Sequence, residues 1–396
     1  MRALVAMSGG VDSSVAAALL LAGGHEVVGA TMKLWGGPSD SGCCSVADVE
    51  DARRVCQQLG ITHHVFNFTA EFEEEVVAPY VEAHAAGMTP NPCISCNAHL
   101  KFDRFWLRAR HLGFDAIATG HHARVTATSE PGPPLAGRAG SPPAGPAGAH
   151  GDCPGQGPAG PGTGRVVWRL RRGQDLGKDQ SYVLYMLGQA QLAELLLPVG
   201  EMTKDEVRRR AATLGLRTAA KPDSQDVCFI SRTGGRQSFL GDRIPVRGGR
   251  LLSAAGADLG EAPDLELLTV GQRRGLGPAA YRSEHKGTPE RRYVVGVDLR
   301  ARTATLGTLE QLLVGSVRVG PVSWAAGALP AGARAHVQTS AHGRAFPARW
   351  EPAPEGGGGR LVFEERIRKV AAGQAVVMYR LELEGDVVLG GATALP

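Results

Sequence analysis

The feature that most constrains the fold is a short polar loop near the N-terminus, Ser8-Gly9-Gly10. An apolar run of strand length, residues 3–7, precedes it, and an Ala- and Leu-rich stretch of helical character, residues 11–22, follows it. The loop therefore stands where a strand delivers the N-terminus of a helix. Glycines let the backbone approach a ligand there, and the first helical N–H groups are unpaired donors. The sequence predicts an anion site suited to phosphate or pyrophosphate.

Side chains of the loop add to this prediction. Ser8, Ser13 and Ser14 supply hydroxyl donors, and the carboxylate of Asp12, which repels phosphate, is expected to bind Mg²⁺. An ordinary strand-to-helix turn with a Ser or Asp cap is the alternative. The pattern is neither a Walker loop nor GxGxxG, but it resembles the SGGxDS loop of the ATP pyrophosphatases. Those enzymes cleave ATP between the α- and β-phosphates and adenylate a substrate.

Residues 1–128 alternate strand and helix patterns, which predicts a doubly wound parallel sheet of the α/β class. We expect strands at 26–32, 63–68 and 115–119. Ligands bind at the carboxyl ends of such strands, so Met32 and Gly120 are expected beside the loop. The predicted ATP site consists of the loop, its flanks and these two strand ends: Ala6, Met7, Ser8, Gly9, Gly10, Val11, Asp12, Ser13, Met32 and Gly120.

Helices are expected at 45–59, 70–86, 98–112, 180–187 and 204–214. Ser45 is expected to cap the first of these, with Asp48 three residues on, and Thr203 and Glu206 form the pattern of a capping box. Beyond about residue 238 the helical period gives way to short β-rich runs with Gly and Pro turns, typical of small antiparallel barrels.

These patterns divide the chain into five segments. Residues 1–128 form the nucleotide domain, and 129–164, mostly Gly and Pro, are expected to be a disordered insertion. Residues 165–237 complete the catalytic domain, 238–312 form a central β-rich domain, and 313–396 form a C-terminal antiparallel β-barrel.

Composition restricts the compartment and the partners. The 396-residue chain has a net charge of +4, which permits an RNA partner, and no run reaches the length of a membrane span. We therefore expect a cytoplasmic protein. Its 7 cysteines are an odd number in a large chain, which favours thiol chemistry or metal over a secreted disulfide framework.

Further motifs follow in order along the chain: TPNPCISCN at 89–97 with Lys101-Phe102, ATGHHAR at 118–124, KDQS at 178–181, DSQDVCFI at 223–230, GQRRGLG at 271–277 and GQAV at 373–376. Together with the SGGVDSS loop they resemble the bacterial tRNA-specific 2-thiouridylases. That resemblance covers nearly the whole chain except the insertion. It implies a catalytic domain like the adenine nucleotide alpha hydrolases.

The resemblance implies ATP-dependent sulfur insertion at C2 of the wobble uridine in the tRNA anticodon stem-loop. The C2 oxygen attacks the α-phosphate, so AMP becomes the leaving group. Sulfur arrives from a donor such as a cysteine desulfurase or a sulfur carrier, as a persulfide on Cys228. Cys96 is the second catalytic thiol, which either forms a disulfide with Cys228 or helps to deliver sulfide. Without the preceding Asp-Ser-Gln-Asp, Cys228 would be better explained as a small buried apolar residue beside Phe229 and Ile230.

The same resemblance implies contacts with tRNA, and it makes the central β-rich domain, residues 238–312, a tRNA-binding domain. Asn91, Pro92 and Cys93 would line the site of the flipped-out base. The remaining predicted tRNA contacts are His121, Lys178, Asp179, Gln180 and Gln374. For the Lys and the His of this set, the alternative is a solvent-exposed side chain with no RNA role.

Two departures from the family pattern affect the site. Some members have Asp at the position of Cys93, and the C-terminal RNA contact corresponds to residues 338–342. With a third cysteine, Cys93, Cys96 and Cys228 could hold a [4Fe-4S] cluster, and the competing hypothesis leaves Cys93 as a spectator. Adjacent Cys43 and Cys44 are a poor metal ligand set.

Two other functions remain open at this point. One is an amide-forming ATP pyrophosphatase such as a GMP or NAD synthetase, which gives no reason for the two thiols. The other is a non-catalytic RNA-binding protein that uses the C-terminal barrels.

Overall fold

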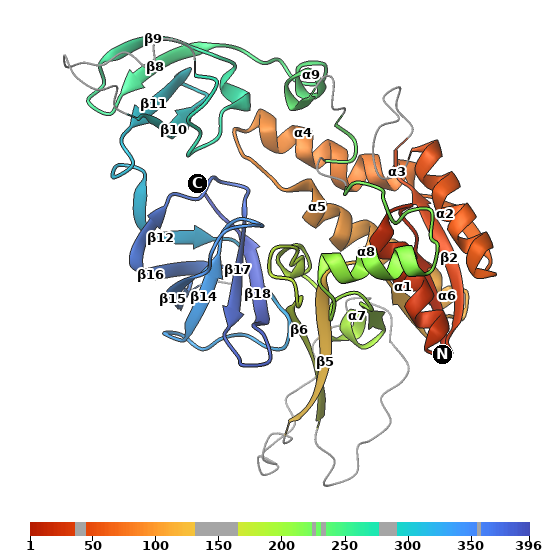
Figure 1. Ribbon diagram of the computed structural model, residues 1–396. Helices are drawn as coiled ribbons and strands as arrows, with labels where there is room; N and C mark the ends of the chain where they lie inside the picture. The colour runs from red at the N-terminus through yellow and green to blue at the C-terminus, as the bar shows by residue number, and fades with distance from the viewer. Residues whose placement is uncertain (36–44, 131–164, 224–226, 231–234, 277–290, 355–357) are drawn as a thin grey trace, which may run out of the picture.

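The computed structural model describes residues 1–35, 45–130, 165–223, 227–230, 235–276, 291–354 and 358–396. Within these ranges the strands form a 5-stranded, a 4-stranded and a 9-stranded sheet. Figure 1 shows most of the first in the N-terminal unit (red to orange), the second in the central unit and most of the third in the C-terminal unit (blue). No described helix has the length and apolar character of a membrane span.

The N-terminal sheet has the strand order β3-β2-β1-β4-β7, and every pair in it is parallel. Its strands are β1 (Arg2–Ala6), β2 (Glu26–Lys33), β3 (His63–Asn67), β4 (Ala116–Ala118) and β7 (Leu195–Leu196). The order reverses beside β1, where ligands of open α/β sheets bind. The predicted parallel α/β fold is confirmed.

Helices cover both faces of this sheet. The α-helices are α1 (Val11–Ala22), α2 (Val46–Leu59), α3 (Thr69–Phe72), α4 (Ala78–Ala85), α5 (Pro92–Ser95), α6 (Phe105–His111), α7 (Gln189–Ala193) and α8 (Lys204–Thr213). Two π-helical turns, η1 (Glu73–Val77) and η2 (Cys96–Arg104), join α3 to α4 and α5 to α6.

Alternation along β1 separates two cores. Ala3 and Val5 pack with Val15 of α1 and Val207 of α8, whereas Leu4 and Ala6 join the core that contains Cys96. Successive side chains of a strand point to opposite faces, so both faces of β1 are covered. The loop after β1 is therefore fixed from both sides of the sheet.

Local capping fixes two helix starts as predicted. Ser45 Oγ accepts a hydrogen bond from the Asp48 N–H at 3.1 Å. At α8 the Thr203 hydroxyl accepts from the Glu206 N–H at 3.3 Å, and the Glu206 carboxylate accepts from the Thr203 N–H at 2.7 Å. Each bond satisfies an N–H group that a helix start leaves unpaired.

The helix predicted at 180–187 is wrong. The segment forms only a 3₁₀ turn, η3 (Ser181–Val183). The Asp179 carboxylate accepts both the N–H and the hydroxyl of Ser181, and the Tyr182 hydroxyl donates to the Ala375 carbonyl at 2.8 Å. These bonds hold the segment against the C-terminal unit and replace the i to i+4 bonds of a helix.

The C-terminal sheet is antiparallel, as predicted, and includes a hairpin from the N-terminal half of the chain. Its strands are β5 (Ala123–Glu130), β6 (Arg165–Arg172), β12 (Leu313–Val319), β13 (Ser323–Trp324), β14 (Arg334–Gln338), β15 (Phe346–Pro352), β16 (Gly359–Arg368), β17 (Ala375–Arg380) and β18 (Val387–Thr393). Strand β5 reaches Glu130, so residues 129 and 130 belong to it and not to the insertion. The rest of the predicted disordered insertion, residues 131–164 with Cys153, lies outside the described residues.

The central sheet has the order β10-β11-β8-β9. Its elements are β8 (Gly249–Ser253), β9 (Asp258–Ala262), β10 (Tyr293–Asp298) and β11 (Thr303–Gly307), with α9 (Gly235–Gly241) and the 3₁₀ turn η4 (Leu265–Leu267). Strands β8 and β11 pair in parallel, contrary to the antiparallel expectation for this region. Residues 254–302, which include β9 and β10, separate the two strands and meet the requirement of parallel neighbours for a crossover of a dozen residues or more.

Candidate active site

The loop between β1 and α1 has the geometry of an anion site. Gly9 has φ +70°, and a Cβ there would lie 2.3 Å from the Asp48 carbonyl oxygen, so the position requires glycine. Gly10 is the N-cap of α1 and offers no side-chain cap. The first N–H groups of α1 are therefore left for a ligand, because a helix start has no internal partners for them.

Hydroxyls and one more glycine complete this loop. Ser8 and Ser13 hydroxyl oxygens lie 3.3 Å apart, and the buried Ser14 hydroxyl donates to the Gly10 carbonyl at 2.8 Å. A Cβ on Gly120 would lie 2.5 Å from Ser13 N, so the end of β4 touches the start of α1. The carboxyl ends of two strands meet at the loop, as the sequence predicts.

The side chains of the other predicted nucleotide contacts point into the cores. Met7 and Val11 belong to the core that contains Val15, and Ala6 and Met32 belong to the core on the other face. What these residues present to the loop edge is their backbone.

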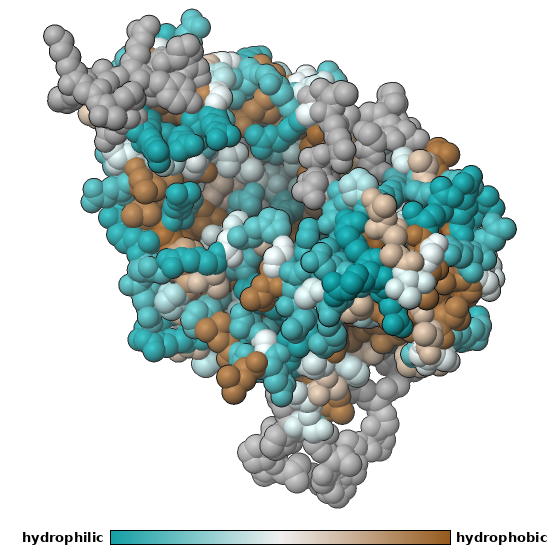
Figure 2. Space-filling model, viewed as in Figure 1, coloured by the Kyte–Doolittle hydropathy of each residue, from teal (hydrophilic) through white to brown (hydrophobic). Residues whose placement is uncertain are grey.

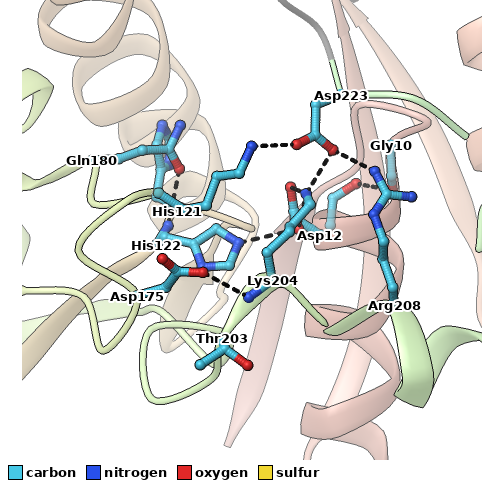
Figure 3. Close-up of polar contacts among 12 residues, drawn as sticks. Gly10, Asp12, His121, His122, Asp175, Gln180, Thr203, Lys204, Arg208 and Asp223 are labelled. Carbon is cyan, nitrogen blue, oxygen red and sulfur yellow. Dashed lines mark hydrogen bonds and ion pairs between the residues drawn. The ribbon is translucent and has the colours of Figure 1, made fainter. Parts of the chain in front are cut away.

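Asp12 lies at the centre of a group of charged side chains (Figure 3). Its two carboxylate oxygens each accept a bond from the Lys204 ammonium at 2.7 Å, and His122 Nε2 lies 3.2 Å from Oδ1. Burial raises the pKa of Asp12, but the bonds to His122 and Lys204 outweigh it and leave the pKa lowered. The carboxylate is therefore ionised at neutral pH.

Asp223 joins the same group from the segment that leads to Cys228. It contacts Lys178 at 2.8 Å, Lys204 at 2.9 Å and Arg208 at 2.8 Å. Burial raises its pKa, yet the bonds from Lys178 and Lys204 bring the pKa down to about 2. Cys228 follows Asp223 by five positions, a covalent reach of at most about 18 Å.

The thiol motifs meet at one cavity. Asn91 caps α5 by accepting the Cys93 N–H at 3.0 Å, Cys93 is exposed, and Cys96 is buried at the start of η2. Cys228 is half-buried and packs on the same core as Cys96. A cavity of about 660 Å³ is lined by Asn91 and Pro92 before the first motif and by Val227 and Ile230 around Cys228, together with Tyr80, His84, Thr89, Pro90, Gly235, Arg236 and Gln374.

Comparisons with known proteins agree with this geometry. The tRNA methyl transferase HUP domain model matches residues 1–232, and the aminomethyltransferase beta-barrel domain model matches residues 314–394. The chain is 43% identical to the tRNA-specific 2-thiouridylase MnmA of Roseiflexus sp., over 98% of both chains. It is 42% identical to the MnmA of Mycobacteroides abscessus, over 99% of both.

The chain belongs to the tRNA-specific 2-thiouridylase (MnmA) family.

Four residues predicted from the MnmA resemblance to touch tRNA have partners within the protein. His121 is buried beside Phe102 and shares a 2.7 Å hydrogen bond with Thr119, and burial lowers its pKa well below the usual value. Asp179 is buried and accepts from Arg172, Gly173 and Ser181. Gln180 accepts the His122 N–H at 2.9 Å, and the Gln374 amide donates to the Thr89 carbonyl.

Lys178 of the same MnmA motif is partly exposed and pairs with Asp223. In the stretch 338–342, Gln338 is buried, accepts from Arg172 at 2.7 Å and donates to the Ser340 carbonyl at 2.8 Å. This stretch is thus anchored to the catalytic half of the chain through Arg172.

The metal predictions have different outcomes. In the described part of the chain, no three His, Cys, Asp or Glu side chains are grouped as a metal site. A [4Fe-4S] cluster binds its thiolates through different iron atoms, so a site for a single ion does not test it, and the cluster on Cys93, Cys96 and Cys228 stays a prediction. Asp12 fits Mg²⁺ that arrives with ATP, because Mg²⁺ is commonly held by one or two carboxylates and substrate phosphates.

The predicted ATP site does not include the cationic residues around the loop. The sequence pattern places Lys204 and Arg208 only in a capped helix. Lys221 donates to the Gly9 carbonyl at 2.9 Å and pairs with Asp48 and Asp51. The available signal was their spacing: Lys204 and Arg208 are four residues apart and lie on one helix face. Cys43, Cys44, residues 224–226 and Gly277 lie outside the described residues.

Proposed function

We propose that this chain is a tRNA sulfurtransferase that replaces the C2 oxygen of the wobble uridine with sulfur at the expense of ATP. The observation that carries the proposal is the cavity whose lining includes the flanks of both thiol motifs, Asn91 and Pro92 on one segment and Val227 and Ile230 on the other. Its volume, about 660 Å³, is in the usual range of ligand sites.

ATP is proposed to bind at the loop before α1, which supports binding through uncapped N–H groups and the hydroxyls of Ser8 and Ser13. Asp12 would hold Mg²⁺, which neutralises charge on the phosphates when bound. The uridine C2 oxygen attacks the α-phosphorus, pyrophosphate leaves, and the base carries AMP at C2. This bond makes C2 open to attack by a sulfur nucleophile.

The sulfur step uses both thiols. A donor of the desulfurase or carrier type leaves a persulfide on Cys228, whose terminal sulfur attacks C2 and expels AMP. The Cys96 thiolate then attacks the Cys228 sulfur, which releases sulfur on the base as 2-thiouridine and leaves a Cys96–Cys228 disulfide. A thiol reductant returns both cysteines to thiols. Attack requires the thiolate form, so a cationic neighbourhood favours it.

Transfer RNA is proposed to reach this cavity with its anticodon stem-loop. Asn91, Pro92 and Cys93 would line the extruded base, and exposed Lys178 is available for a phosphate contact. Buried His121 and Asp179, together with partly buried Gln180, would act by holding the site in shape.

A single reconstitution tests the proposal. Purified protein, unmodified tRNA, Mg-ATP, a persulfide donor and a reductant are incubated together, and the tRNA nucleosides are analysed by mass spectrometry. The expected products are 2-thiouridine, AMP and pyrophosphate, formed only when tRNA is present. ADP and phosphate as products would overturn it, and AMP formation without any thiolated nucleoside would overturn it in favour of an AMP-forming ligase.

A further inference from the structure

The position of the Lys204 ammonium beside the nucleotide loop suggests a role beyond that of a structural ion pair. Lys204 is the first residue of α8, and its backbone N–H is fixed by the Asp175 carboxylate at 3.0 Å. Its side chain is only 10% exposed, and the ammonium lies against both oxygens of Asp12 in the first turn of α1 (Figure 3). A buried cation is thus held at the edge of the loop where phosphates are expected.

The two carboxylates around Lys204 do not depend on it. Asp223 has two further cationic partners, Lys178 at 2.8 Å and Arg208 at 2.8 Å, and Asp12 also has His122. The ammonium can therefore leave both carboxylates while each keeps another partner. An unpaired buried charge, which is the usual penalty for breaking a buried pair, is thereby avoided.

The ammonium also competes with a metal for the same atoms. A cation on Asp12 requires at least one of the two oxygens that Lys204 contacts, and two cations at one carboxylate repel each other. Lysine has a flexible four-carbon stem and three donors, so its ammonium can turn to a neighbouring phosphate while α8 stays in place.

We propose that Lys204 is a nucleotide-binding catalytic residue: it pairs with Asp12 in the nucleotide-free protein and transfers to the phosphate chain when Mg-ATP takes Asp12. The inference rests on the proposed function, since it needs ATP at this loop. In the adenylation step the ammonium stabilises the negative charge that builds up on the departing pyrophosphate. No proton is transferred, and Lys204 stays charged throughout.

ATP binding measured by calorimetry, with Mg²⁺ and again with EDTA, separates the roles of the two partners. Lys204→Met is expected to weaken ATP binding about tenfold or more in both conditions, because a charge-assisted bond to phosphate is lost. Asp12→Asn is expected to weaken binding only with Mg²⁺. In EDTA, Asp12→Asn is expected to bind ATP as tightly as wild type or more tightly. Without Mg²⁺ the Asp12 carboxylate is not needed as a metal ligand, and its loss frees Lys204 to contact the phosphates.

The double variant Asp12→Asn/Lys204→Met shows whether the loss belongs to Lys204 itself. It is expected to bind metal-free ATP as weakly as Lys204→Met, although it leaves no unpaired Asp12. Arg217→Met, which removes a cation paired with Asp51 away from Asp12, is the matched control and is expected to bind ATP normally. Thermal unfolding of each variant verifies that it is folded.

Wild-type affinity of Lys204→Met in EDTA would overturn the inference and leave the proposed function standing. Equal losses for Asp12→Asn and Lys204→Met in both conditions would also overturn it, because they indicate a purely structural pair. A wild-type protein that binds no ATP in either condition would instead overturn the proposed function.

Discussion

At the scale of single residues, the three cysteines near the cavity differ in what surrounds them. Cys96 is buried at the start of η2, Cys228 is half-buried on the same core, and Cys93 is exposed at the start of α5. Partial burial protects a persulfide from water, whereas an exposed thiol offers no such protection. We therefore assign the chemistry to Cys96 and Cys228 and none to Cys93.

Substitution of each cysteine tests this assignment. Cys228→Ser and Cys96→Ser are expected to lose thiolation by at least about a hundredfold while still releasing pyrophosphate with tRNA, since adenylation precedes the sulfur step and uses neither thiol. Cys93→Ala is expected to thiolate within about threefold of wild type. Mass spectrometry of the tRNA and pyrophosphate release are the two measurements. Comparable losses in all three variants would contradict the assignment.

His84 supplies a prediction about pH. Burial, followed by the nearby Arg236 charge, lowers its pKa to about 4, so it is neutral in the folded protein at pH 7. The unfolded chain binds this proton near pH 6.5, so the stability that neutral His84 provides is complete above pH 6.5 and falls as the pH drops to about 4. His84→Phe is expected to reduce the slope of unfolding free energy against pH by up to about 1.4 kcal/mol per pH unit in that window. Urea unfolding across the window measures it, and an unchanged slope would refute the prediction.

At the scale of elements, local pattern predicted some features and missed others for physical reasons. The starts of α1, α2 and α8 depend on capping and glycine geometry within a few residues, so the sequence specifies them. The segment 180–187 has a helical pattern but forms only a 3₁₀ turn. The hydroxyl of Tyr182 donates a hydrogen bond to the carbonyl of Ala375, a residue distant in sequence, which the local pattern cannot show. The same limit applies to the Asp12 site, because Lys204 reaches it only through the packing of α8 on α1.

The β5–β6 hairpin gives the prediction for this scale. Glu130 and Arg165 pair directly across the two strands, so the chain leaves and re-enters the described structure at adjacent points. Replacing residues 131–164 with a four-residue Gly/Ser turn is expected to retain thiolation, and loop closure changes by only about 0.6 kcal/mol per doubling of length. Activity and thermal stability are compared with wild type. A folded variant that no longer thiolates would show that the segment takes part in function.

At the scale of the whole molecule, the face seen in Figure 2 is mostly hydrophilic, with hydrophobic side chains in separate patches. The catalytic and C-terminal units share a hydrophobic core, in which Tyr182 and Tyr379 both take part, and are joined in addition by a partly buried polar contact. Arg172 at the end of β6 donates to Asp179 at 2.8 Å, to Asp386 at 2.9 Å and to Gln338 at 2.7 Å. Its guanidinium also lies 3.8 Å from the centre of the Tyr379 ring. One side chain thus binds both units.

From Arg172 a bonded path leads to the nucleotide loop. Asp179 is followed by Gln180, whose side-chain oxygen accepts the His122 N–H and whose backbone N–H donates to the His122 carbonyl. His122 Nε2 in turn contacts Asp12. Because tRNA is expected to bind both units, a displacement of the C-terminal unit can act on Asp12 through these bonds. Neighbouring Arg171 offers a comparison: its side chain is 5% exposed against 12% for Arg172, and it bonds Glu382 and Thr126, whereas the partners of Arg172 include Asp179.

Arg172→Met is therefore expected to remove the stimulation of AMP formation by tRNA while ATP affinity stays within about threefold of wild type, since the loop itself is intact. Loss of one partner in a buried ion pair also lowers stability by about 3 kcal/mol. Arg171→Met is expected to cost similar stability but to keep the stimulation by tRNA, because its bonds do not lead to Asp12. AMP release with and without tRNA, at a temperature where both variants are folded, measures the difference. Equal loss of stimulation in both variants would show that general loosening of the hairpin, and not the path through Asp179 and His122, connects the two units.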